Sequence, residues 1–293
     1  MTRRRILVGL VGANIMKSLS PPLFAAAFRS AGMDGYYHLM DVDQLPGRTL
    51  PDLINAVRTA GFAMVNVTYP FKQDVKAMID TMDQSAAQVG SVNTVAFAPD
   101  GRTTGYNFDR AGFRRSFEEG LGRDSANGKT VVMIGAGGAG RAVGFAMMDL
   151  GANLVIHDID RKKSQGLADD IAKHYGQKRV RLAGDLEQEV AAAAGVANAT
   201  QLGMLGFPGN PVPVNAMKAG QWASDVIYTP IQTDFLRAAA AKGCRTLNGA
   251  GMCTYQAMEA FRMLTGIDLD AKVMHRAFAD GLALRDADLA KSA

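Results

Sequence analysis

The feature that most constrains the fold of this chain is a glycine-rich turn that directly follows an apolar strand. Thr130–Ile134 is a short β-branched run, and the residues at 135–140 read G-A-G-G-A-G. A helical pattern then continues to Leu150 and is ended by Gly151. Strand, turn and helix in this order, with glycines at the first, third and sixth positions, are the pattern that holds the pyrophosphate of a dinucleotide at a helix N-terminus.

The three spaced glycines each have a physical task. Gly135 permits the tight turn, Gly137 lets the backbone approach the phosphates, and Gly140 lets the helix pack closely on the strand. The alternative is a glycine-rich turn without a ligand. However, the next strand, Leu154–His157, ends at Asp158, at about the 20-residue spacing expected of an acid that binds the ribose hydroxyls. We therefore assign the whole turn to the cofactor site: Gly135, Ala136, Gly137, Gly138, Ala139 and Gly140.

The charges after this strand bear on the choice of cofactor. A carboxylate at Asp158 accepts a hydrogen bond from a 2′-hydroxyl and repels a 2′-phosphate, and Asp160 adds a second negative charge. Three basic residues follow and offer a clamp for a 2′-phosphate, although a solvated helix start is their commoner role: Arg161, Lys162 and Lys163. We expect NAD rather than NADP, with Arg161 among the residues at the cofactor.

The 293 residues predict about two domains, and strand-like runs alternate with helix-like runs from the start. This alternation predicts an open, mostly parallel α/β sheet. The turn signal Pro99-Asp100-Gly101 predicts that the first sheet finishes with an antiparallel hairpin. The expected strands are Ile6–Val11, Tyr36–Val42, Phe62–Val67, Thr94–Phe97 and Arg102–Tyr106, and the expected helices are Pro22–Ala31, Asp52–Ala60 and Asp74–Met82.

A second α/β unit begins after the helix expected from Asp109 to Glu119. Two terminal helices, Cys253–Leu264 and Ala271–Leu289, are expected to pack back on the first domain. We therefore predict two α/β domains around a cleft. Residues 1–108 with 253–293 form the substrate-binding catalytic domain, and 109–252 form a Rossmann dinucleotide-binding domain. Besides the strands named above, the second unit should contain Val180–Leu182, Gly195–Asn198, Ser224–Ile227 and the helix Phe235–Ala241.

Composition excludes several other classes. The net charge of +4 is too small and too evenly spread for a nucleic-acid footprint. The longest uncharged stretch, 190–217, contains three prolines, which excludes a spanning helix. The short, glycine-rich apolar run after the N-terminal arginines is interpreted as a first strand of a cytoplasmic protein rather than as a signal peptide. Neither the two cysteines nor the four scattered histidines have the spacing of a metal site or a disulfide framework.

Four polar motifs in the first domain fall where a strand ends or a helix starts. Ligands bind at the carboxyl ends of the strands of such sheets, so these side chains are expected around one polyol ligand. Taken singly, each has a plainer explanation: Ser20, Asn107 or Asp109 as a helix cap, and Lys72 as a solvated lysine. Taken together at one edge, they favour a site. The motifs are S-L-S-P (18–21), N-V-T-Y-P-F-K (66–72), V-N-T (92–94) and G-Y-N-F-D-R-A-G (105–112).

Over nearly its whole length the chain resembles the shikimate dehydrogenase family, which includes the quinate/shikimate dehydrogenases. Four further motifs stand in the order of the family: N-A-T (198–200), L-G-M (202–204), D-V-I-Y (225–228) and N-G-A-G-M-C-T-Y-Q-A (248–257). The resemblance implies reversible hydride transfer between a nicotinamide and a hydroxyl of shikimate or quinate, giving 3-dehydroshikimate or 3-dehydroquinate.

The resemblance also implies roles for individual residues. Lys72 and Asp109 would form the catalytic pair, with Lys72 as the preferred acceptor of the proton that alcohol oxidation releases. Thr200 and Gly251 would lie at the cofactor. The residues that would bind the carboxylate and hydroxyls of the substrate are Ser18, Ser20, Thr68, Asn93, Tyr228 and Gln256.

Three positions depart from the family pattern. Phe108 replaces the threonine of N-T-D, Lys17 replaces a histidine, and D-I-D at 158–160 replaces the N-R-T-like run of NADP-dependent members. The last departure favours NAD, whereas the first leaves the choice between quinate and shikimate open. A dehydrogenase of a related compound such as aminoshikimate, and a non-catalytic dinucleotide-binding regulator of the same fold, are the alternatives. The oligomeric state is open, with a homodimer as one expectation.

Overall fold

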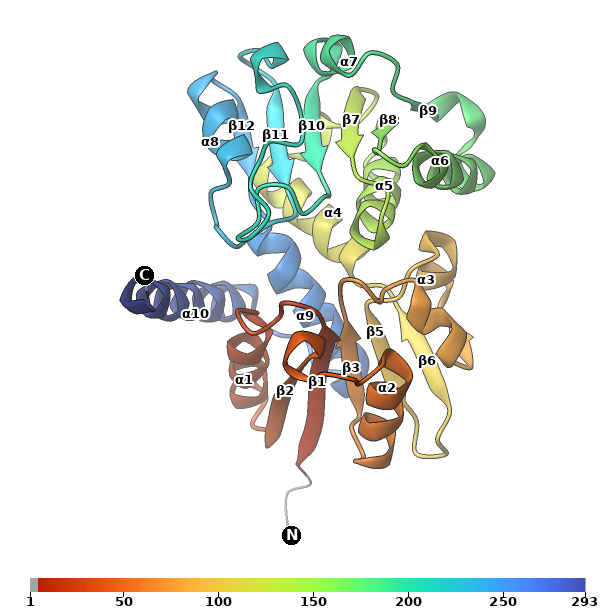
Figure 1. Ribbon diagram of the computed structural model, residues 1–293, viewed down its shortest axis with the longest axis vertical. Helices are drawn as coiled ribbons and strands as arrows, with labels where there is room; N and C mark the ends of the chain where they lie inside the picture. Colours follow the sequence, from red (N-terminus) through yellow and green to blue (C-terminus); the bar gives the residue numbers. More distant parts are fainter. Residues whose placement is uncertain (1–4, 293) are drawn as a thin grey trace. The chain divides into compact units, whose positions relative to one another are not determined.

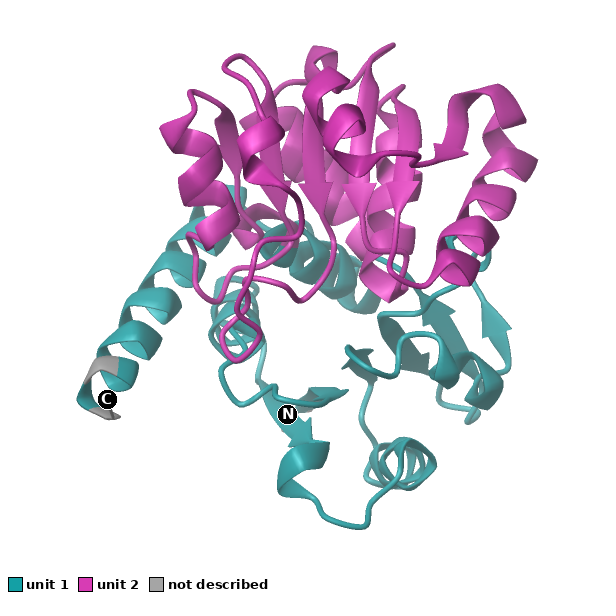
Figure 2. Ribbon diagram, turned by 45° about the horizontal axis from the view of Figure 1, so that its top comes forward, with its two compact units in different colours: residues 1–108, 253–293 teal, residues 109–252 magenta. Residues whose placement is uncertain are grey.

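The computed structural model describes residues 5–292 (Figure 1). The chain divides into two compact units, drawn in two colours in Figure 2. Unit 1 comprises Met1–Phe108 and Cys253–Ala293, and unit 2 comprises Asp109–Met252. Each unit contains a six-stranded sheet. Within residues 5–292, no helix has both the length and the apolar character needed to cross a membrane.

The sheet of unit 1 has the strand order β2-β1-β3-β5-β6-β4. Strand β1 pairs in parallel with both β2 and β3, whereas β5 pairs antiparallel with both β3 and β6. The predicted terminal hairpin is therefore confirmed. The strands are β1 (Ile6–Gly12), β2 (Gly35–Asp41), β3 (Met64–Val67), β4 (Thr81–Met82), β5 (Thr94–Phe97) and β6 (Thr103–Tyr106).

The helices of unit 1 bury aromatic residues against the sheet and against each other. Phe24 of α1 lies 4.6 Å from Tyr37 of β2 between ring centroids, and Phe28 lies 5.5 Å from Phe261 of α9. The C-terminal segment is therefore packed on α1, although the two are far apart in sequence. The helices are α1 (Ser20–Ser30), α2 (Leu50–Thr59), α3 (Gln84–Val89), α9 (Ala250–Thr265, in unit 1 from Cys253) and α10 (Ala271–Ser292).

The prediction of a helix over Asp74–Met82 is wrong. The segment forms a 3₁₀ helix, η2 (Asp74–Met78), and then the short strand β4 (Thr81–Met82). The carboxylate of Asp80 accepts hydrogen bonds from the backbone nitrogen and the hydroxyl of Thr103, at 2.7 and 2.8 Å. These bonds to β6 compete with the helical backbone bonds and hold the chain extended.

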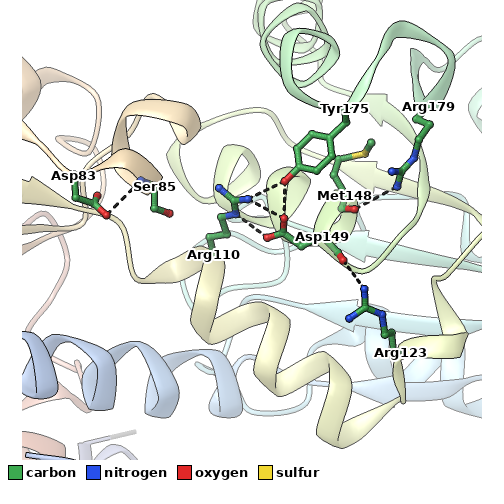
Figure 3. A network of polar contacts seen from close by, with 8 residues as sticks. All are labelled: Asp83, Ser85, Arg110, Arg123, Met148, Asp149, Tyr175 and Arg179. Atoms are coloured by element: carbon green, nitrogen blue, oxygen red, sulfur yellow. Dashed lines mark hydrogen bonds and ion pairs between the residues drawn. The ribbon is translucent and has the colours of Figure 1, made fainter.

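Helix α3 was not expected from the sequence, and its ends show why it forms. Asp83 accepts a hydrogen bond from the backbone nitrogen of Ser85 at 3.3 Å (Figure 3). It also accepts one from the backbone nitrogen of Ala86 at 2.8 Å. Gly90 ends the helix with a φ of 69°, a left-handed conformation that glycine adopts without steric cost. A side-chain cap and a C-terminal glycine therefore define this single short helix.

The sheet of unit 2 has the order β12-β11-β10-β7-β8-β9, and every neighbouring pair is parallel. This is the doubly wound order of the Rossmann fold, in which the order reverses between β7 and β10. The predicted fold class is confirmed. The strands are β7 (Thr130–Ile134), β8 (Asn153–His157), β9 (Val180–Leu182), β10 (Gly195–Asn198), β11 (Trp222–Asp225) and β12 (Arg245–Leu247).

Strand β11 begins two residues before the expected Ser224. Trp222 pairs with Gly195 of β10, where a Cβ would lie 2.1 Å from the indole ring. Phe117 packs edge-on against the same ring, with centroids 5.0 Å apart. The helices of unit 2 are α4 (Asp109–Gly120), α5 (Gly138–Asp149), α6 (Arg161–Tyr175), α7 (Leu186–Ala192) and α8 (Asp234–Ala241).

Candidate functional site

The sheet register of unit 1 brings the polar motifs to one edge. The parallel strands β1, β2 and β3 end there, and the antiparallel β5 starts there. Thr94, the first residue of β5, pairs with Asn66 on one side and with Tyr106 on the other. The motifs around residues 66–72, 92–94 and 105–108 therefore lie at a common edge, as parallel strand ends do.

A buried carboxylate shapes the loop that leads to Ser18. Asp41 ends β2 and is 3% exposed. Its two oxygens accept hydrogen bonds from the backbone nitrogens of Ile15, at 2.8 Å, and Asn14, at 3.1 Å. Asp41 is not among the site residues predicted from the motifs, although an acid at the carboxyl end of a parallel strand is an available signal.

The two serines of the first motif lie at the start of α1. The N-cap residue is Leu19 and no side chain caps the helix, so the alternative reading of Ser20 as an N-cap is wrong. Instead, the hydroxyl of Ser18 accepts a hydrogen bond from the backbone nitrogen of Ser20 at 3.2 Å. Both serines are half-buried. Their binding of a substrate carboxylate stays a prediction.

The loop that carries Thr68 and Lys72 is held by backbone hydrogen bonds. The backbone nitrogen of Thr68 donates to Val11 at 3.0 Å, and the carbonyl of Lys72 accepts from Val92 at 2.8 Å. A Cβ at Gly12 would lie 2.3 Å from the methyl group of Thr68, so glycine is required for this close approach. Both ends of the loop are therefore fixed to the sheet, with Lys72 half-buried.

Asn93 is the hydrogen-bonding centre of this edge and is only 3% exposed. Its Oδ1 accepts from the hydroxyl of Thr94 and from the backbone nitrogen of Phe108, both at 3.0 Å. Its Nδ2 donates to Oε1 of Gln256 at 2.9 Å. Two residues assigned to substrate binding from distant motifs, Asn93 and Gln256, are therefore in direct contact.

Two further residues complete the description of this edge. Asn107, which the sequence analysis considered only as a cap, donates through Nδ2 to the carbonyl and the hydroxyl of Ser91, both at 2.9 Å. Phe108 is stacked on Tyr106 with ring centroids 5.6 Å apart. The next residue, Asp109, begins α4 in unit 2 and is 1% exposed. The pairing of Asp109 with Lys72 stays a prediction.

The glycine turn of unit 2 has the geometry of a phosphate cradle. Gly135 has a φ of 97°, and its backbone nitrogen donates to His157 at 2.8 Å. A Cβ at Gly140 would lie 2.0 Å from the carbonyl oxygen of Gly135, whereas a Cβ at Gly137 would meet no atom within 4 Å. Two glycines therefore allow close packing, and Gly137 leaves open space at the N-terminus of α5. These residues fit a bound pyrophosphate.

Asp158 lies against the glycine turn. Its Oδ2 accepts from the backbone nitrogen of Ala136 at 2.7 Å, and its Oδ1 accepts from that of Asp160 at 2.8 Å. This support of the turn was not predicted. Each carboxylate oxygen has a further lone pair, so these bonds leave acceptor capacity for ribose hydroxyls. The side chain of Arg161 is exposed at the start of α6.

A buried polar chain positions Thr200 beside the turn. Oδ1 of Asn198 accepts from the hydroxyl of Thr200 at 2.7 Å, and its Nδ2 donates to Asp225 at 3.1 Å. Asp225 also accepts from the hydroxyl of Thr233 at 2.8 Å. Burial raises the pKa of Asp225 to about 6, although hydrogen bonds from Ile227, Thr233 and Asn198 act to lower it. The motifs N-A-T and D-V-I-Y therefore form one network.

Gly251 and Tyr228 are the last two residues assigned to the site. A Cβ at Gly251 would lie 2.2 Å from the hydroxyl oxygen of Ser116, so this glycine is required for packing against α4. Tyr228 follows β11 and is half-buried. The contact of Gly251 with a cofactor and that of Tyr228 with a substrate stay predictions.

Comparisons with known proteins cover almost the whole chain. Residues 10–95 match the family model for the shikimate dehydrogenase substrate binding domain. The chain is 41% identical to the quinate/shikimate dehydrogenase (NAD(+)) of Corynebacterium efficiens, over 95% of this chain and 99% of that protein. It is 39% identical to the shikimate dehydrogenase (NADP(+)) of Streptomyces avermitilis, over 94% and 95%.

A solved structure is similar over the same extent. Quinate dehydrogenase from Corynebacterium glutamicum in complex with NAD matches with a TM-score of 0.86 and 38% identity, covering 94% of this chain and 100% of that chain. The proteins similar to this chain therefore include some that are named as NAD-dependent and some that are named as NADP-dependent.

Alanine substitutions in the glycine turn should separate packing from ligand binding. Gly137→Ala places a methyl group in open space, in a backbone conformation that alanine adopts, so the ligand-free protein should keep its unfolding temperature. Binding of NAD should weaken about tenfold or more, because the methyl group occupies the phosphate cradle. Gly140→Ala should instead destabilise the fold by about 1–3 kcal/mol. Thermal unfolding and titration calorimetry measure the two effects, and wild-type NAD affinity in Gly137→Ala would contradict the cradle.

Asp225→Asn should remove a pH dependence of stability. The pKa of Asp225 is about 6 in the folded protein, above the ordinary value of 3.8. Its contribution to stability is therefore fully present below about pH 4 and is lost as the pH rises through about 6, an effect of about 3 kcal/mol. The amide of asparagine can still accept from Ile227 and donate to Thr233, which preserves the fold.

The pH dependence of the contribution of Asp225 to stability is tested by urea unfolding of Asp225→Asn and of the wild type at a series of pH values. The wild-type free energy of unfolding, relative to that of the variant, should fall between about pH 4 and pH 6 and stay level above. A difference that does not change with pH would show that Asp225 titrates normally.

Proposed function

Since the chain belongs to the shikimate dehydrogenase family, we propose that it is an NAD-dependent quinate/shikimate dehydrogenase. It transfers a hydride reversibly between the nicotinamide and the C3 position of quinate, or the equivalent position of shikimate. The oxidised products are 3-dehydroquinate and 3-dehydroshikimate. The observation that carries this proposal is the similarity, over nearly the full length, to relatives whose names state this activity.

The reaction releases a proton, and a residue of the chain must accept it. Oxidation of a secondary alcohol breaks a C–H bond, whose electron pair leaves with the hydride, and an O–H bond, whose proton needs an acceptor. The nicotinamide, when bound, supplies the hydride acceptor. Lys72 takes the proton on Nζ in our proposal, and the carboxylate of Asp109 favours the resulting ammonium and orients a substrate hydroxyl.

The edge of the unit 1 sheet supports the proposed substrate contacts. The contact between Asn93 and Gln256 places two amides near the end of β3 and the start of β5. Oδ1 of Asn93 is already used twice, so Asn93 offers a ligand its second N–H, and Gln256 offers its amide nitrogen. Such groups suit a ligand that carries several hydroxyls. Ser18 and Ser20 are proposed to bind the carboxylate, with Thr68, Asn93, Tyr228 and Gln256 binding the hydroxyls or the carboxylate.

The position of Asp158 supports NAD as the preferred cofactor. Two backbone hydrogen bonds fix its carboxylate beside the glycine turn. A fixed negative charge there accepts from the 2′-hydroxyl of NAD and repels the 2′-phosphate of NADP. Arg161, at the start of α6, is proposed to lie at the cofactor, whereas the exposed Lys162 and Lys163 are then a solvated helix start.

Lys72→Ala tests the proposed chemistry. The turnover number with quinate or shikimate should fall about 1000-fold, whereas KM for the substrate should change only a few-fold, because the lysine acts on the transition state. Lys76→Ala removes a neighbouring half-buried lysine of η2 and should keep normal turnover. Near-normal turnover of Lys72→Ala would refute the role of the lysine.

The wild type in the same assay distinguishes the alternatives. Turnover of an amino derivative of shikimate alone would replace the proposed substrate. Binding of NAD and substrate without any reduction of NAD would identify a non-catalytic regulator and contradict the proposal.

A further inference from the structure

The first turn of α4 is fastened to α5 and α6 by a polar network (Figure 3). Arg110 donates a hydrogen bond to each carboxylate oxygen of Asp149, through Nε at 2.7 Å and through Nη2 at 2.8 Å. The same Nη2 donates to the hydroxyl of Tyr175 at 2.8 Å, and this hydroxyl donates to Asp149 at 2.5 Å. Three side chains from three helices therefore form a ring of hydrogen bonds in which each side chain contacts the other two.

The network is shielded from solvent. The side chains of Arg110 and Asp149 are 15% and 17% exposed, and the guanidinium lies 5.4 Å from the centre of the Phe145 ring. Burial and the hydrogen bond to Asp149 raise the pKa of Tyr175 to about 12, so its hydroxyl remains a donor at neutral pH. A planar guanidinium that binds both oxygens fixes orientation as well as distance.

Asp149 does not stabilise the helix that carries it. It is the last residue of α5, and a negative charge at a helix C-terminus is unfavourable. Arg110 offsets this cost, so the structural result of the pair is the position of α4 relative to α5. Helix α5 is also the helix that begins at the glycine turn.

Arg110 immediately follows Asp109 in α4. Successive residues of a helix are separated by a rise of about 1.5 Å and a fixed rotation, so holding one side chain sets the direction of its neighbour. The residue on the other side, Phe108, is held through its backbone nitrogen by Asn93 at 3.0 Å. Both neighbours of Asp109 are therefore fixed.

We propose that Arg110 is a positioning residue for the reaction. Together with Asp149 and Tyr175 it sets the direction in which the side chain of Asp109 projects from α4. It also fixes this direction relative to α5, the helix that begins at the glycine turn. This inference rests on the proposed function of Asp109.

The test compares Arg110→Met with Arg179→Met. Arg179 is also half-buried and lies 5.9 Å from the centre of the Tyr175 ring, but it donates its hydrogen bonds to the carbonyls of Met148 and Ala152, at 3.2 and 2.9 Å, rather than to α4. Arg110→Met should lower kcat about 10- to 100-fold with little change in KM for NAD or substrate. Arg179→Met should keep the wild-type kcat, and both variants should lose stability.

Two further measurements make the outcome decisive. Arg110→Lys should restore stability but not kcat, because an ammonium is a point charge that cannot reproduce the planar grip. Hydrogen exchange of the 109–113 amides should accelerate in Arg110→Met and not in Arg179→Met, and this readout does not depend on activity. Equal exchange in the two variants overturns the proposal. So does a normal kcat of Arg110→Met in an enzyme that Asp109→Asn inactivates, a result that leaves the proposed function intact.

Discussion

Residue 140 must be glycine, because a Cβ there would lie 2.0 Å from the carbonyl oxygen of Gly135. The candidate cofactor site of unit 2 depends on this close approach of the two backbones. Because the backbones approach so closely, α5 starts directly at the end of β7, with its N-terminal amides turned toward the turn. Asp158 and Thr200 then meet the turn from the neighbouring strands. One glycine contact therefore determines where a dinucleotide can bind.

The polar edge of the unit 1 sheet depends chiefly on strand direction. Strand β5 runs against β3, so Asn93 arrives where β3 ends, and from there it holds Thr94, Phe108 and Gln256. A single buried amide thus links a strand, the approach to α4 and helix α9. The polar side chains of this edge are therefore held by rigid elements of unit 1.

The sequence predicted the elements that are governed by local patterns and missed those governed by distant partners. β7 and β10 have the expected bounds because an apolar run between turn residues identifies a buried strand. The helix expected over 74–82 is wrong because Asp80 binds Thr103, a residue on another strand. The same reason explains why the partnership of Arg110 with Asp149, 39 positions apart, could not be foreseen.

The most direct test of the account is a steady-state assay of the wild type with quinate and with shikimate, each offered NAD and NADP separately. The account predicts reduction of NAD with at least one substrate, with kcat/KM for NAD above that for NADP by about tenfold or more, since Asp158 repels the 2′-phosphate. Turnover with NADP alone would contradict the role of Asp158, and no turnover in any combination would contradict the proposed activity.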